Sequence, residues 1–324
     1  MILLTLVSAA AIISIALVRP KEHKHAAKLS GFNLLDCTYQ KLSDPPTNRS
    51  HSTQINDIHT QDVSVHGNLR TTSSRNWAGY VVGRDLVNPV KKTIKMVSAT
   101  WTIPRVMPRR PINLPRYSAT WVGIDGFNNA SNPATLAQLG TESDWEPNNE
   151  DNNNNNNITG AAGMQVDYAW FKVGDKPPTM IVNFPIAAGD VISASIQSRA
   201  KTPGYFRMTI RNETRGMAVV IPSQLTISPH SLCATAAFVI ELPSDKNANQ
   251  RQPLLADFGA QTFHECVCMI DERLGPINDS NDKRQFAPIN MVGNTDQPIL
   301  TKTIANTSSL SPDGKSFSVT FAPY

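Results

Sequence analysis

The stretch Ser118–Glu146, SATWVGIDGFNNASNPATLAQLGTESDWE, carries the strand pattern and the turn chemistry that decide the fold. An apolar run at Trp121–Ile124 leads into Asp125-Gly126 and a polar loop, and a second apolar run follows at Thr135–Leu139. Asp-Gly pairs are typical of tight turns, because glycine accepts a positive φ and aspartate bonds to nearby backbone. The stretch therefore predicts two neighbouring strands joined by a turn and a loop.

Similar short runs rich in β-branched and aromatic residues recur along the chain after residue 75. Turn residues separate them about every 8–12 positions, which is the spacing of sandwiches and barrels. The expected strands are 76–82, 96–104, 117–124, 164–173, 180–186, 190–198, 205–212, 217–222, 236–242, 255–259, 264–270, 299–304 and 316–324. No stretch after residue 20 has helical periodicity, so the sequence predicts an all-β domain, with the Asn-rich stretch 148–157 as a surface loop.

Length and composition limit the class of protein. The 324 residues suffice for one large domain with processed segments, and a hydrophobic fraction of 40% supports a buried core. Charged residues make up 17%, and the net charge is only +4. Lysine and arginine are scattered except at Arg19–Lys28, so the chain has no basic stripe and we expect no nucleic-acid partner.

The first 74 residues differ from the remainder. Residues 2–18 are uncharged and almost wholly apolar, which favours a secretory signal peptide at 1–18 over a membrane anchor. Residues 19–74 hold most of the histidines and many Ser, Thr and Asn, which favours a propeptide over a disordered spacer. We therefore expect an exported protein with one domain at 75–324. Sequons that fit export begin at Asn48, Asn129, Asn157, Asn212, Asn278 and Asn306.

The cysteines leave the pairing open. Cys37, Cys233, Cys266 and Cys268 permit disulfides in an exported chain, although Cys37 lies in the leader. His264 precedes Cys266 and Cys268 at alternate positions, which are donor types for a metal cluster. In an exported chain, structural cysteines or disulfides are the better interpretation, and we expect neither a metal nor a cofactor.

The sequence lacks the catalytic motifs of several common classes of hydrolase. It contains no Gly-X-Ser-X-Gly elbow, no Asp-Thr-Gly or Asp-Ser-Gly motif and no His-Glu-X-X-His zinc motif. Carboxylates and glutamine remain as candidates. Glu241 ends the apolar run 236–240, where alternation places it on one face with Ala237 and Val239. Gln138 lies between small and apolar neighbours in the second run of the opening stretch.

A second group of acids lies at Glu142, Asp144 and Glu146. On a strand these alternate residues would share a face in steps of about 6.6 Å. The pattern resembles the Glu-X-Asp-X-Glu strand of retaining β-glucanases, whose two carboxyl groups lie about 5–5.5 Å apart. It is also compatible with an acidic strand end that leads into the Asn-rich loop.

Several motifs together resemble one family, the glutamic peptidases or eqolisins. The Trp-Val-Gly-Ile-Asp-Gly run and the Phe-Val-Ile-Glu run, in that order, are the specific parts, and the resemblance covers roughly residues 75–270. The matching pieces, in family order, are 76–79, 97–100 with 103–104, 121–126, 136–140, 168–171, 231–233 and 238–241.

The resemblance implies a lectin-like, concanavalin-type sandwich of two antiparallel sheets and a secreted, acid-acting endopeptidase with an N-terminal propeptide. It places the catalytic glutamine at Gln138 and the catalytic glutamate at Glu241, with Trp77 and Trp121 lining the substrate cleft. The chain departs from the family pattern in two places. It has Ala169 where the family has a glutamate near the site, and it lacks the cysteine near residue 127 that usually partners Cys233.

Such a pair has a clear chemistry. A carboxylate can take a proton from the attacking water and return it to the leaving nitrogen, while a neutral amide can donate to the developing oxyanion. The expected partners are protein or peptide substrates, and the expected state is a monomer. Two alternatives stay open: a β-sandwich glycoside hydrolase that uses Glu142 and Glu146, and a lectin-like binding protein without catalysis.

Overall fold

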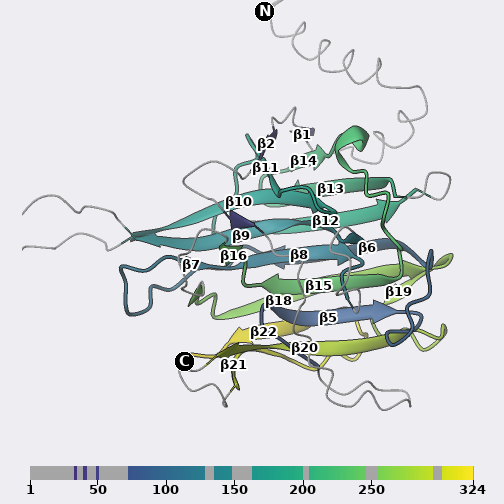
Figure 1. Ribbon diagram of the computed structural model, residues 1–324. Helices are drawn as coiled ribbons and strands as arrows, with labels where there is room; N and C mark the ends of the chain where they lie inside the picture. Colours follow the sequence, from purple (N-terminus) through teal and green to yellow (C-terminus); the bar gives the residue numbers. More distant parts are fainter. Residues whose placement is uncertain are drawn as a thin grey trace, which may run out of the picture.

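The computed structural model describes three short strands in the leader, at 33–34, 39–41 and 49–50, and most of the chain from residue 72 onward. The described ranges there are 72–127, 135–147, 163–199, 204–245, 254–294 and 301–323. Within these residues the secondary structure is β-strand apart from a 3-10 turn at Ser223–Leu225, and no helix is long and apolar enough to cross a membrane (Figure 1). The all-β prediction is confirmed, while the Asn-rich stretch 148–157 lies outside the described residues.

The first sheet contains the strands that the opening stretch predicted. Each strand of this sheet runs antiparallel to the strands next to it. The order is β11 (Thr179–Ile181), β10 (Gly163–Val173), β9 (Ala137–Pro147), β8 (Ala119–Ile124), β15 (Thr235–Glu241), β5 (Trp77–Gly83) and β20 (Gln285–Asn294). Strand β9 extends well beyond the expected apolar run and includes the whole acidic group at 142–146.

The second sheet is also antiparallel. Its order is β14 (Met217–Val220), β13 (Phe206–Asn212), β12 (Val191–Ser198), β6 (Ile94–Thr102), β18 (Ala260–Ile270) and β22 (Phe317–Phe321). Strand β21 (Thr301–Thr307) pairs with both β20 and β22 and so joins the two sheets. Strand β19 (Arg273–Pro276) forms a hairpin with β18.

Short strands extend the sheet edges. Within the domain, β4 (Thr72–Ser74) pairs with β20, while β7 (Arg116–Tyr117) pairs with β9 and with β17 (Leu254–Leu255). The leader strands pair with three different partners. They are β1 (Asn33–Leu34) beside β14, β2 (Tyr39–Lys41) beside β11, and β3 (Arg49–Ser50) beside β16 (Ser244–Asp245).

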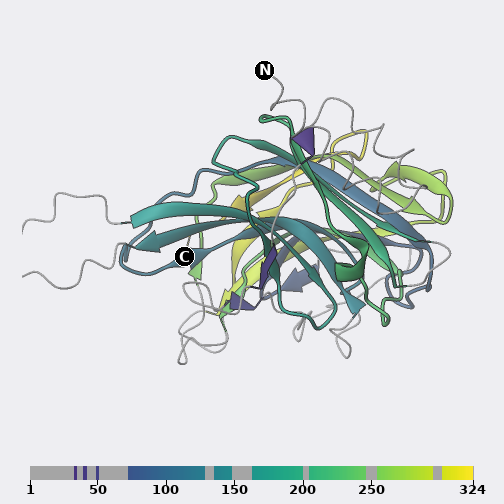
Figure 2. The ribbon, with the colours of Figure 1, turned by 90° about the horizontal axis from the view of Figure 1, so that it is seen from above.

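The two sheets pack face to face around one large apolar core, and Figure 2 views the same strands from above. Val122 and Leu139 contribute from the first sheet, and Trp101 and Ile192 from the second. The indole Nε1 of Trp101 donates across the interface to Thr141 Oγ1 at 3.0 Å. Because side chains alternate along a strand, the residues between these core positions lie on the outer face of the first sheet.

Strand β20 is not predicted by the sequence pattern, because it contains Pro288. Its pairing with β5 runs from Gln285 to Ile289. Pairing with β4 begins only at Ile289, and pairing with β21 begins only at Met291. Pro288 therefore lies before either of those partners has begun, at a point where a missing N–H costs no ladder bond. A proline inside a strand is tolerated under this condition.

The strand expected at 180–186 is also shorter than predicted. Strand β11 ends at Ile181, and Asn183 then adopts a φ of 65°, which turns the chain away from the sheet. Asparagine is one of the few residues that adopt this left-handed conformation readily. Apolar content alone therefore overestimates this strand.

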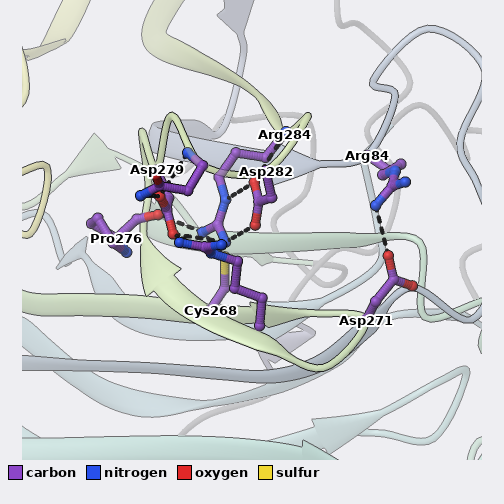
Figure 3. A network of polar contacts seen from close by, with 9 residues as sticks. Arg84, Cys268, Asp271, Pro276, Asp279, Asp282 and Arg284 are labelled. Atoms are coloured by element: carbon purple, nitrogen blue, oxygen red, sulfur yellow. Dashed lines mark hydrogen bonds and ion pairs between the residues drawn. The ribbon is translucent and has the colours of Figure 1, made fainter.

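The loop that leads from β19 into β20 is held by a buried guanidinium. The Arg284 side chain is 1% exposed and forms an ion pair with Asp282, while Asp279 Oδ2 lies 3.8 Å from its Nη2 (Figure 3). Its Nη1 also donates to the carbonyl oxygen of Pro276 and to Cys268 Sγ. A buried charge is costly unless it is paired, so these contacts favour a single geometry for the loop.

Asp125 holds the segment that enters β15. Its buried carboxylate accepts hydrogen bonds from Ser231 Oγ at 2.6 Å and from the backbone N–H groups of Leu232, Cys233 and Ala234 at 2.8–2.9 Å. Burial raises the pKa of Asp125, although these four donors oppose the rise. The turn predicted from Asp125-Gly126 thus also fixes a segment more than a hundred residues later.

Replacing Asp125 by alanine should destabilise the domain strongly. The change leaves two buried backbone N–H groups and one partly buried N–H group without their acceptor, and each buried loss costs about 1–3 kcal/mol. We expect the free energy of unfolding in urea to fall by at least about 3 kcal/mol. Asp85→Ala is the matched control, because Asp85 also accepts two backbone N–H groups but in an exposed turn. Equal losses for the two variants would contradict this role of Asp125.

Asp167 makes the stability of the folded domain depend on pH. Burial raises its pKa, and hydrogen bonds from Gln165 Nε2 only partly offset that effect. A raised pKa in the folded state means that Asp167 contributes stability below its ordinary value of 3.8, and that this contribution is lost as the pH rises through the raised value.

Asp167→Asn should therefore gain stability relative to the wild type as the pH rises from about 3 to about 7. Denaturant unfolding of both proteins across this range measures the difference. Asp313→Asn is a control of opposite sign, because hydrogen bonds from Ser311 and the Lys315 backbone lower the pKa of Asp313. A pH-independent difference between the wild type and Asp167→Asn would show that Asp167 does not act in this way.

Candidate active site

The predicted catalytic residues lie on the outer face of the first sheet, which we call the dyad face. Glu241, the last residue of β15, pairs in register with Ala119 of β8 and with Trp77 of β5. Gln138 on β9 pairs with Gly123 of β8, so β8 lies between the two strands that carry the predicted pair. Strands β9 and β15 are thus separated only by β8 in the sheet, although they are far apart in the sequence.

The two head groups meet above β8. Gln138 Nε2 lies 3.4 Å from Glu241 Oε2, and Trp121 Nε1 donates to the same carboxylate oxygen at 2.8 Å. All three residues are 0% exposed. The structure thus brings Gln138, Glu241 and Trp121 together, and one carboxylate oxygen receives both donors.

Trp77 belongs to the same cluster. Its ring packs edge-to-face against Trp121, with centroids 4.9 Å apart and an interplanar angle of 79°. Its indole Nε1 is buried and has no hydrogen-bond partner in the structure. The two tryptophans expected to line the cleft therefore lie together on the dyad face, beside the glutamate.

Two glycines make room for the Trp121 side chain. A Cβ on Gly140 would lie 2.5 Å from the Cβ of Trp121, and a Cβ on Gly123 would lie 2.7 Å from the indole ring. Both distances are shorter than carbon atoms tolerate. The indole can therefore lie close to the sheet and reach the carboxylate only because β8 itself and the neighbouring strand β9 carry glycine at these positions.

The acidic residues at 142–146 are spread along strand β9. Glu142 is fully buried on the dyad face, in register with Ala119 and with Tyr168 of β10. Glu146 lies near the end of β9, opposite Met164, and is half-buried. Four positions along a strand span about 13 Å, which exceeds the separations of both retaining and inverting glycosidase carboxylates. The geometry does not support the glycoside hydrolase alternative.

The departure at Ala169 does not affect the dyad face. Ala169 is part of the core between the sheets and pairs with Thr141 of β9. The sequence analysis placed this position near the site. The structure corrects that interpretation, since the neighbouring residues Tyr168 and Trp170 are the ones on the dyad face.

The described residues contain no group of three or more His, Cys, Asp or Glu side chains that could hold a metal ion. Cys233, Cys266 and Cys268 carry free, buried thiols, and burial raises the pKa of Cys268 to about 12. Cys37 lies outside the described residues. A surface cavity of about 520 Å³, lined in part by Thr102 and His264, does not include the predicted pair.

Sequence reasoning missed one residue of the dyad face. Lys172 on β10 pairs directly with Gln138 and is only 6% exposed. The sequence does contain a signal for it. Tyr168, Trp170 and Lys172 alternate along the strand and therefore share a face. The partner strand and its register, however, cannot be read from that alternation.

Comparisons with known proteins agree with this architecture. Residues 75–311 match the sequence model of the peptidase A4 family, and no curated protein matches the chain. Scytalido-glutamic peptidase, solved with a peptide-based transition-state analogue, is 20% identical with a TM-score of 0.53, over 76% of this chain and 98% of that chain.

SCP-B is a second similar structure, described as a member of the eqolisin family in complex with the tripeptide Ala-Ile-His. It is 20% identical with a TM-score of 0.50, over 76% of this chain and 98% of its own. Both structures share the β-sandwich fold found here. Since the family match spans most of the sequence, this chain belongs to the peptidase A4 family, the glutamic peptidases or eqolisins.

Proposed function

We propose that this protein is an acid-acting endopeptidase in which Glu241 is the general base and Gln138 stabilises the oxyanion. The observation that carries the proposal is the meeting of the two head groups, 3.4 Å apart, on one buried face of the sheet. Membership of a peptidase family indicates peptide substrates. The finer assignment of roles to residues rests on their chemistry.

Glu241 is suited to move the proton. A carboxylate can take a proton from water as the water attacks the scissile carbonyl, and can then return it to the leaving nitrogen. Trp121 and Gln138 both donate to Oε2, which fixes the plane of the carboxylate. The other oxygen, Oε1, is then the one that faces the water in this mechanism.

Gln138 is suited to the oxyanion. Its NH₂ group offers two donors, so one N–H can contact Glu241 while the other is directed at the substrate carbonyl. An aligned donor of this kind contributes about 2.7–4 kcal/mol to transition-state stabilisation. A carboxamide does not titrate, so the donor persists in acid, where many peptidase groups change charge.

Three variants separate the roles. Glu241→Gln should abolish proteolysis of denatured protein at acid pH, because it removes the general base. Gln138→Ala should lower kcat by about 10²–10³-fold, as for the loss of one oxyanion donor. Glu146→Gln is the control and should retain activity, because this residue lies at the far end of β9. Near-wild-type proteolysis by Glu241→Gln would overturn the proposal.

We further propose that residues 1–18 are a signal peptide, that 19–74 are a propeptide, and that the protein is secreted as a monomer. One chain supplies the whole predicted pair, which supports activity without a partner subunit. Leader strand β3 pairs with β16, which begins three residues after Glu241. Removal of the leader would therefore release a contact close to the predicted general base.

The secreted, active enzyme should then begin near Thr71–Asn76. N-terminal sequencing of the purified protein, combined with an activity assay on the same sample, tests this boundary. Recovery of fully active protein that begins at residue 19 or 20 would rule out the propeptide assignment. Size-exclusion chromatography of that sample tests the monomer.

A further inference from the structure

Lys172 is a buried cation beside the proposed oxyanion donor. Strand β10 pairs with β9 so that Lys172 lies directly opposite Gln138, and both side chains are on the dyad face. Residues directly opposite one another in an antiparallel pair have Cβ atoms about 4.5–5.5 Å apart, so their side chains lie within reach of one another. Lys172 is only 6% exposed, and lysine is seldom buried to this extent.

Gln138 has one satisfied end and one unsatisfied end. Its Nε2 faces Glu241 Oε2, while its Oε1 is buried and has no hydrogen-bond partner in the structure. A buried acceptor that lacks a donor costs about 1–3 kcal/mol. The same acceptor lies on the residue whose neighbour across the strand pair is Lys172.

The orientation of the amide matters for the reaction. The two ends of a carboxamide have nearly the same shape, so packing alone does not decide which end faces the glutamate. In the flipped orientation, Oε1 would face the Glu241 carboxylate and no N–H would be available for the substrate carbonyl. The Glu241 carboxylate already favours the NH₂ end, because it accepts hydrogen bonds, and a donor to Oε1 would favour the same orientation further.

An ammonium group is able to favour this orientation. Lysine has three N–H donors and no acceptor, so it can hydrogen-bond to Oε1 and cannot hydrogen-bond to the NH₂ end. Hydrogen bonds from charged donors are about twice as strong as neutral ones. Such a bond also withdraws electron density from the amide, which makes its N–H groups better donors to an oxyanion.

We propose that Lys172 is a positioning residue that holds the Gln138 amide with its NH₂ group toward Glu241 and the scissile carbonyl. The ammonium donates to Oε1 when the substrate is bound, so the working unit is Lys172, Gln138 and Glu241. This inference rests on the proposed peptidase function, because it concerns the same site. It adds a residue that acts through Gln138 and has no contact with the water.

Lys172→Met tests the inference, because methionine keeps most of the length and the apolar stem but removes the donors. We expect kcat on a peptide substrate at acid pH to fall by about 10–100-fold, the range for a hydrogen bond to a charged group. KM should stay within about twofold, because the amide that Lys172 orients acts on the oxyanion, which forms only in the transition state. Lys172→Arg restores a donor-only cation and should recover most of kcat.

A double-mutant cycle separates positioning from simple packing. If Lys172 acts through the amide, Lys172→Met should cost nothing further in a Gln138→Ala background. Lys176→Met is the matched control, because Lys176 is exposed in the turn after β10. That variant should leave kcat and KM unchanged, and thermal unfolding of every variant confirms that it folds.

The outcomes are distinct. The inference is supported if Lys172→Met lowers kcat when Gln138 is present but not in the Gln138→Ala background, and if Lys172→Arg restores kcat. A kcat within twofold of wild type for Lys172→Met, or an equal loss in both backgrounds, overturns it. Failure of the proposed function is recognised separately, because in that case Glu241→Gln would keep its proteolytic activity whatever Lys172→Met does.

Discussion

The register of strand β8 between β9 and β15 is the constraint on which the site depends. Side chains alternate with a period of two, so a slip of one residue on either side would turn Gln138 or Glu241 into the core. The core itself prevents the slip, because Val122 and Leu139 would then leave it for the outer face. The hydrophobic pattern that folds the sandwich thus also places an amide and a carboxylate 3.4 Å apart.

Close backbone contacts reinforce this register. Gly79 on β5 has a φ of 142°, and a Cβ there would lie 2.0 Å from the carbonyl oxygen of Phe238 on β15. Only glycine tolerates both the positive φ and the lack of space for a Cβ, so the close approach of β5 to β15 requires glycine at this position. At the other end of β15, Asp125 binds three successive backbone N–H groups of the preceding segment. The strand that ends in Glu241 is therefore fixed along its length and at its start.

Much of the fold could be predicted from local sequence, because alternation and turn residues act over a few positions. Strands β5, β8, β10 and β15 follow their apolar patterns closely. Strand β20 was missed since Pro288 breaks a local rule, and the structure tolerates it only through the order in which distant strands join. The partners of Asp125 and of Lys172 were missed for the same reason. Each depends on a pairing between segments far apart in the chain, which no local pattern encodes.

The same distinction separates two positions on β10, Ala169 and Lys172. Position 169 lies in the core opposite Thr141, so an alanine there changes the packing between the sheets and leaves the charge of the dyad face as it was. Position 172 lies on the dyad face, so a lysine there lies beside the amide that we propose as the oxyanion donor. A neutral amide is a weaker oxyanion donor than a charged group, but it keeps its state in acid. In the proposed arrangement, a lysine beside the glutamine strengthens the oxyanion donor without itself contacting the substrate.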